Sequence, residues 1–189
     1  MKEEFNARAC PDAPDYEPHL WEGEFQDDNN CYAYAVNDRQ TRKGCWPQPG
    51  GNAGISYDQH YSKPAHDHIW WAMRDGLLLA PCMMQQKGFY LVALAVDLKD
   101  GRWSGHNPGY HWWRQDSDGL WSHKPGANPV RREDESGNLI RNPRECDRGI
   151  YKHFVGFSWV PKGGLRVSPP AADPQGRKGW FPSLIPSWW

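Results

Sequence analysis

Residues 21–40 have the sequence WEGEFQDDNNCYAYAVNDRQ, and a second informative stretch, YHWWRQDSDGLWSHKPG, occupies residues 110–126. In the first stretch, the polar residues Asp27 to Asn30 precede a short run with apolar residues at helical spacing, a pattern typical of a helix N-cap. It predicts a helix from Cys31 to about Asn37, with Cys31 in the first turn.

The second stretch predicts a β-hairpin. Polar and aromatic residues alternate on both sides of DSDG, and Asp-Gly is a strong turn signal. The predicted pairing sets Gln115 opposite Leu120 or a near neighbour. Because alternate residues of a strand share a face, His123 then comes close to the level of His111 or Tyr110.

Three further elements complete the expected fold. An N-cap at Asp67 followed by apolar residues at helical spacing predicts a second helix towards Leu77. The apolar run GFYLVALAVDL (88–98) predicts a buried central strand, and YKHFVGFSWVP (151–161) predicts another strand that ends at Pro161. Helices followed by antiparallel strands indicate the α+β class.

Length and composition indicate one domain. The chain has 189 residues and a mean hydropathy of −0.89, but its 12 Trp, 8 Tyr and 6 Phe predict a small, aromatic-rich core. Residues 1–20 are expected to be an extended lead-in, 21–162 the folded and catalytic domain, and 163–189 a tail rich in proline and aromatic residues.

Charge and hydropathy exclude two classes of partner. The formal net charge is −1 without a long basic run, which argues against nucleic acid, and no stretch approaches 18 apolar residues, which argues against a membrane span. The N-terminus lacks the apolar region of a Sec signal peptide. We therefore expect a cytoplasmic protein or export by another route, such as a secretion system or phage delivery.

The five cysteines form no C-x-x-C pair, so a cysteine-based zinc site has no support. The cluster His66-Asp67-His68 has metal-ligand residue types, but a capping Asp67 would be occupied and the two imidazoles would diverge. No metal or other cofactor is expected. An odd count leaves one thiol unpaired, for which Cys31 is the candidate. Two disulfides or five free thiols both remain open for the other cysteines, which are Cys10, Cys45, Cys82 and Cys146.

Cys31 and two histidines form the candidate chemical constellation. A helix N-terminus lowers a cysteine pKa and so favours the nucleophilic thiolate, although an unpaired cysteine in a helix is often simply a small buried apolar residue. His111 and His123 on paired strands can act as a base and the residue that orients it. The alternative is that both histidines are ordinary, half-exposed strand residues.

These residues resemble the papain-like cysteine hydrolases, in particular the cell-wall amidases and endopeptidases of the NlpC and CHAP kinds. The resemblance covers about residues 21–38 and 110–126, and Asn30-Cys31-Tyr32-Ala33 replaces the usual Asp-Cys-Ser-Gly. It implies a Cys-bearing helix packed on an antiparallel sheet. It also implies a nucleophile at Cys31, a general base at His111 and an orienting residue at His123.

The same resemblance implies further site residues and an activity. Asn30, or else Gln26, would supply an oxyanion donor, and Tyr32 would line the site, unless these are capping, loop or packing residues. The implied activity is amide hydrolysis through an acyl-enzyme. The implied substrate is a peptide or a peptidoglycan stem peptide, and the implied setting is an antibacterial effector toxin, with a cognate immunity protein, or a phage lysin.

The phrases NCYAYA, YHWWRQ and WSHKPG also resemble a smaller group of bacterial proteins and molluscan shell-matrix proteins, a likeness that implies no activity. Two non-catalytic alternatives follow. One is a carbohydrate- or matrix-binding module with Trp112, Trp113 and Trp121 exposed as a stacking surface. The other is a matrix-type protein that kept the papain-like fold and lost the chemistry.

Overall fold

A computed structural model of the protein describes residues 10–41, 46–55, 67–99, 102–103 and 109–167. The helical elements are η1 (Pro18–Trp21), α1 (Glu24–Asp28), α2 (Cys31–Ala35), η2 (Gly51–Ala53) and α4 (Asp67–Asp75). The strands are β1 (Leu78–Ala80), β2 (Phe89–Val96), β3 (Leu98–Lys99), β4 (Arg102–Trp103), β5 (Tyr110–Gln115), β6 (Trp121–Ser122) and β7 (His153–Pro161).

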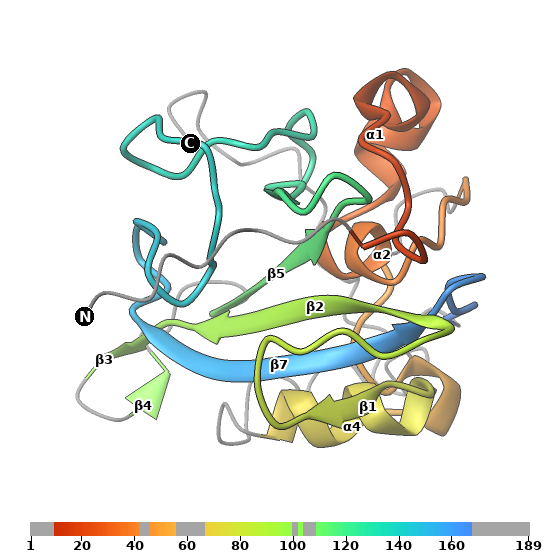
Figure 1. Ribbon diagram of the computed structural model, residues 1–189. Coiled ribbons are helices and arrows are strands. Elements are labelled where there is room, and N and C mark those ends of the chain that lie inside the picture. Colours follow the sequence, from red (N-terminus) through yellow and green to blue (C-terminus); the bar gives the residue numbers. More distant parts are fainter. Residues whose placement is uncertain (1–9, 42–45, 56–66, 100–101, 104–108, 168–189) are drawn as a thin grey trace.

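Five of these strands form an antiparallel sheet in the order β1-β7-β2-β5-β6. Strand β2 lies at its centre, and the long strands β2 and β7 run side by side across the molecule (Figure 1). Strands β3 and β4 pair separately. Every residue of β2 after Phe89 is buried, as expected for a strand with neighbours on both sides and cover on both faces.

The sheet separates two apolar clusters because successive side chains of a strand point to opposite faces. On one face, Tyr32 of α2 and Ile69 of α4 pack with Trp112 of β5. On the other face, Trp113 of β5 packs with Ile140, which lies in the irregular segment after β6. The sheet is therefore covered on one side by helices and on the other by long loops.

The start of α2 is determined by Asn30. Its side-chain oxygen accepts a hydrogen bond from the amide of Ala33 (3.0 Å), and its side-chain nitrogen donates to the carbonyl of Pro47 (2.9 Å). The first bond satisfies an amide that has no partner within the helix. The second ties the helix N-terminus to the loop that follows residue 45.

The predicted α+β class is confirmed, and so are the main elements: a helix beginning at Cys31, a second helix before Leu77, a central strand in 88–98, the hairpin and a strand that ends at Pro161. Asp67, predicted as the N-cap of the second helix, lies within α4 instead. The hairpin pairs Gln115 with Trp121, one residue away from the Gln115–Leu120 pairing. The elements that were not predicted are η1, α1, η2, β1, β3 and β4. Asp27 and Asp28, expected in a capping loop, form the end of α1.

The N-terminal segment from residue 10 contributes to the core. Cys10 is buried in the helix-side cluster, and its amide donates to the carbonyl of Ser117 (2.9 Å). Residues 1–9 and 168–189, which hold the rest of the predicted lead-in and most of the predicted tail, lie outside the described residues.

Replacing Asn30 tests the capping role. Asn30→Ala removes both buried hydrogen bonds and should lower the free energy of unfolding by about 2 kcal/mol, whereas Asn30→Ser, which keeps an acceptor for the Ala33 amide, should cost less. Urea unfolding followed by tryptophan fluorescence measures both. Equal stability of wild type and Asn30→Ala would contradict this role.

Candidate functional site

The β5–β6 hairpin carries the polar residues that the sequence singled out, together with several that it did not. All six residues of β5 are buried. The turn closes with hydrogen bonds from the Asp116 amide to the Leu120 carbonyl (2.8 Å) and from the Gly119 amide to the Asp116 carbonyl (2.9 Å). Gly119 has φ 88°, a left-handed conformation that favours glycine.

The two histidines form a direct pair. His111 Nε2 lies 2.7 Å from His123 Nδ1, and His123 Nε2 lies 2.9 Å from the carbonyl oxygen of Glu133. A carbonyl only accepts, so His123 carries its proton on Nε2, and its Nδ1 accepts from His111 Nε2–H. The extended hairpin register sets His123 opposite Trp113, so His111 is its diagonal neighbour on the same face.

Burial keeps this histidine pair neutral. Desolvation lowers the pKa of His123 to about 4 and holds the pKa of His111 well below its ordinary value of 6.5. The His111 ring also stacks on Tyr151, with ring centroids 5.1 Å apart. The pair therefore acts as a packed, hydrogen-bonded part of the core at neutral pH.

Cys31 is the first residue of α2, as predicted, but burial governs its chemistry. Its exposed fraction is 5%, and desolvation raises the pKa of its thiol to about 12, against the lowering effects of the Trp112 amide and the Lys124 charge. In the described part of the chain, no hydrogen bond joins this thiol to His111 or His123. The thiol is protonated at neutral pH.

The other predicted site residues have structural partners. The side-chain nitrogen of Asn30, the first candidate oxyanion donor, is bound to Pro47. The main-chain carbonyl of Gln26 accepts a hydrogen bond from Lys124 Nζ. Tyr32 is fully buried, and its hydroxyl donates a hydrogen bond to Asp75 Oδ2 (2.7 Å). Tyr32 is therefore a core residue and does not line an open site.

Lys124 is a residue that the sequence analysis missed. Its ammonium group is buried and donates to the carbonyls of Gln26 and Gly126. Desolvation lowers the pKa of Lys124 to about 7, although the nearby Cys31 acts against this shift. A lysine two residues after a buried strand gives no sequence signal of this environment.

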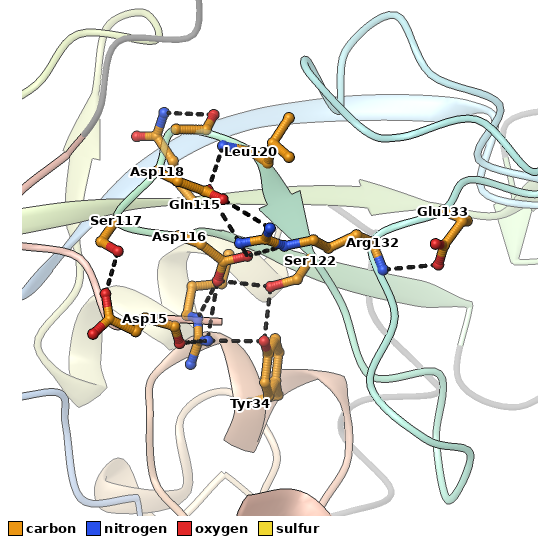
Figure 2. A network of polar contacts seen from close by, with 12 residues as sticks. Asp15, Tyr34, Gln115, Asp116, Ser117, Asp118, Leu120, Ser122, Arg132 and Glu133 are labelled. Carbon is orange, nitrogen blue, oxygen red and sulfur yellow. Dashed lines mark hydrogen bonds and ion pairs between the residues drawn. The ribbon is translucent and has the colours of Figure 1, made fainter. Parts of the chain in front are cut away.

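A second polar network, also missed, lies on the helix-facing side of the hairpin (Figure 2). Arg114 Nη2 donates to Tyr34 Oη (2.8 Å), Tyr34 Oη lies 2.7 Å from Ser122 Oγ, and Ser122 Oγ donates to Asp116 Oδ1 (2.8 Å). Because Ser122 uses its proton on Asp116, it accepts from Tyr34. Arg132 Nε closes the network by donating to Asp116 Oδ2 (3.1 Å).

The network is a buried charge cluster. Arg114 and Asp116 have side chains only 2% and 0% exposed, with Nη2 and Oδ1 3.1 Å apart. Burial raises the pKa of Asp116, and Arg114 and Arg132 act against that rise. Arg114 shares a face of its predicted strand with the aromatic residues Tyr110 and Trp112, and this was the signal that could have revealed it, because a charge among packed aromatic residues requires a partner.

The stacking surface expected for a binding module is absent from the hairpin. The exposed fractions of Trp112, Trp113 and Trp121 are 0%, 2% and 0%, so the prediction that they are exposed was wrong. Both faces of the sheet are covered at these positions, and the three indoles pack in the two apolar clusters.

The described residues contain no group of three or more His, Cys, Asp or Glu side chains placed to hold a metal ion, and His66 of the cluster His66-Asp67-His68 lies outside them. They also contain no disulfide, with Cys10, Cys31, Cys82 and Cys146 as free thiols. None of the helices in this part of the chain is long and apolar enough to cross a membrane.

Comparison with known proteins finds no matching family model and no matching solved structure. The chain is, however, 36% identical over 157 residues to insoluble matrix shell protein 1 of Ruditapes philippinarum. The aligned region spans 82% of this chain and 93% of that protein. The chain belongs to the family of this shell protein.

Family membership corrects the functional prediction. The relative is named as a shell-matrix protein and not as a peptidase or amidase, so the predicted cysteine hydrolase was wrong, and with it the acyl-enzyme, peptidoglycan, antibacterial effector and lysin predictions. The weaker resemblance to shell-matrix proteins is confirmed at the level of the whole chain. Local spacing had matched a catalytic pattern, but burial of Cys31 removes the thiolate on which that pattern depends.

Thiol alkylation tests the state of Cys31. At pH 7.5, iodoacetamide should modify Cys31 far more slowly than the exposed Cys82, because the Cys31 thiol is buried and has a pKa of about 12. Peptide mapping by mass spectrometry measures both rates, and unfolding in urea should make them similar. Faster labelling of Cys31 than of Cys82 in the folded protein would contradict the assignment.

Acid titration tests the histidine pair. A histidine whose folded pKa lies below 6.5 binds more protons when unfolded, so stability is lost as pH falls from about 6.5 towards 4. Each histidine should contribute a slope of up to about 1.4 kcal/mol per pH unit. Urea unfolding between pH 4.5 and 7 should give a shallower slope for His123→Gln. The matched control is His19→Gln, because His19 is exposed. If the free energy of unfolding changed equally with pH in wild type, His123→Gln and His19→Gln, the assignment would be refuted.

Proposed function

We propose that the protein is a non-catalytic component of an insoluble organic matrix, which it binds through its folded domain. Its 36% identity to insoluble matrix shell protein 1 over most of both chains carries this proposal. A place of action outside the cell is part of it. The predicted immunity partner and peptide substrate belong to the rejected hydrolase and have no role here.

We further infer that the domain retains a papain-like arrangement whose chemistry has been lost. Three features support this inference: Cys31 opens a helix, that helix packs on β5 through Tyr32 and Trp112 (ring centroids 5.3 Å apart), and β5 presents His111 to His123. Burial has turned each of these polar groups into a packed, neutral part of the core.

The residues that contact the matrix must lie elsewhere than the three hairpin tryptophans. Trp112, Trp113 and Trp121 are enclosed and cannot stack on a ligand. A buried hairpin suits a supporting role, since its polar network contacts Tyr34 of α2 and Arg132 in the segment after β6. Matrix contact then falls to exposed side chains on the outer surface of the domain.

Adsorption to solid matrices tests the proposal. The purified protein should sediment with at least one of three insoluble phases, namely chitin particles, calcium-crosslinked alginate beads and calcium carbonate powder. Cys31→Ala should adsorb as well as wild type, because the thiol has no part in binding. A heat-unfolded sample and bovine albumin serve as controls for non-specific adsorption. Failure to sediment with any phase, or loss of adsorption in Cys31→Ala with the fold intact, would refute the proposal.

A further inference from the structure

A polar groove of about 290 Å³ lies beside the buried charge network and plays no part in the features described so far. Its volume is at the lower end of the range for ligand sites. Four separate stretches of chain form its walls: the N-terminal segment, the residues after α2, strand β5 and the residues after β7. The residues used below are Asp15, Glu17, Leu20, Arg39, Arg114 and Arg166.

Arg114 lines this groove and carries the observation on which the inference depends. Its side chain is 2% exposed, and Nε and Nη2 bind Asp116, Tyr34 and the carbonyl of Asp15. Its other terminal nitrogen, Nη1, has no hydrogen-bond partner among the described residues. That atom is not one of the fully enclosed, unpartnered polar atoms, so a ligand can reach it. The polar network thus contains a buried guanidinium group, that of Arg114, whose Nη1 is free to donate hydrogen bonds to a ligand.

Two exposed arginines add donors to the same groove. Arg39 Nη1 donates to the carbonyl of Leu20 (2.8 Å), and Arg166 Nη1 donates to Asp38 Oδ1 (2.9 Å). Each bond fixes one side of a guanidinium group and leaves further N–H groups without a partner among the described residues. The groove is therefore rich in oriented donors and suits a ligand with carboxylate oxygens.

The remaining lining limits the class of ligand. Asp15 and Glu17 also line the groove, and Ser117 donates to Asp15. Two carboxylates disfavour a densely charged anion such as a polyphosphate, but they accept hydrogen bonds from hydroxyl groups. Leu20, which is partly exposed, adds a small apolar surface to this otherwise polar lining.

We propose that this groove binds an acidic saccharide, with a uronate carboxylate held by Arg114, Arg39 and Arg166 and with hydroxyl groups donating to Asp15 and Glu17. The inference rests on the proposed function and names the chemistry of the matrix component that the domain recognises. Arg114 and Arg166 are ion-paired with Asp116 and Asp38, so the groove offers directed N–H donors and little net positive charge, which suits a ligand with one carboxylate on each sugar.

Calorimetric titration with trigalacturonate, and with neutral chitotriose for comparison, tests the site. The Arg39→Ala/Arg166→Ala variant should bind trigalacturonate about 10- to 100-fold more weakly than wild type, because charge-assisted hydrogen bonds are lost. The matched control is Arg141→Ala/Lys152→Ala, which removes the same charge from exposed residues outside the groove and should bind like wild type. Wild-type affinity should also fall as salt is raised.

Equal affinity for chitotriose, unchanged binding in Arg39→Ala/Arg166→Ala, or no binding of trigalacturonate by the folded wild type would each overturn the inference. Circular dichroism and the unfolding midpoint establish that the variants are folded. The proposed matrix-binding function and the proposed saccharide site can be refuted independently of each other. A protein that adsorbs to chitin or carbonate but does not bind trigalacturonate refutes only the groove, whereas one that adsorbs to no matrix refutes the proposed function.

Discussion

The buried charge on Asp116 is the constraint on which the hairpin and its surroundings depend. A carboxylate removed from water is costly unless charges and donors surround it, and here Arg114, Arg132 and Ser122 do so. Each of these partners comes from a different part of the chain around the turn, and Tyr34 links them to α2. The packing of α2 on β5, and the position of the loop that contains Arg132, follow from that requirement.

Burial also decides what the polar residues of this domain can do. Cys31 begins a helix, where the backbone favours a thiolate, yet desolvation outweighs that effect and the pKa rises. His111, His123 and Lys124 are shifted towards their neutral forms for the same reason. Cys31, His111 and His123 thus become neutral parts of the core, and the pKa of Lys124 falls to about 7.

Much of the fold followed from local patterns. Asn30 before an apolar run marked the start of α2, the run from Phe89 marked the central strand, and the Asp-Gly turn marked the hairpin. The register was predicted within one residue, which was enough to bring His111 and His123 together. The helix α1 was missed because Asp27 and Asp28 are also typical of a capping loop, and β1 was missed because three residues carry too little pattern.

The sequence by itself determined the α+β class, the helix that begins at Cys31 and the pairing of the two hairpin strands, because each depends on residues close together in the chain. Only the tertiary structure decided that Cys31 is buried, that Trp112, Trp113 and Trp121 are enclosed, and that Arg114 lies beside a groove. Solvent exposure and pKa depend on which distant segments cover a residue, here residues 10–21 and 130–167. Local spacing can place a thiol near an imidazole, but it carries no information on the desolvation that determines whether the thiol ionises.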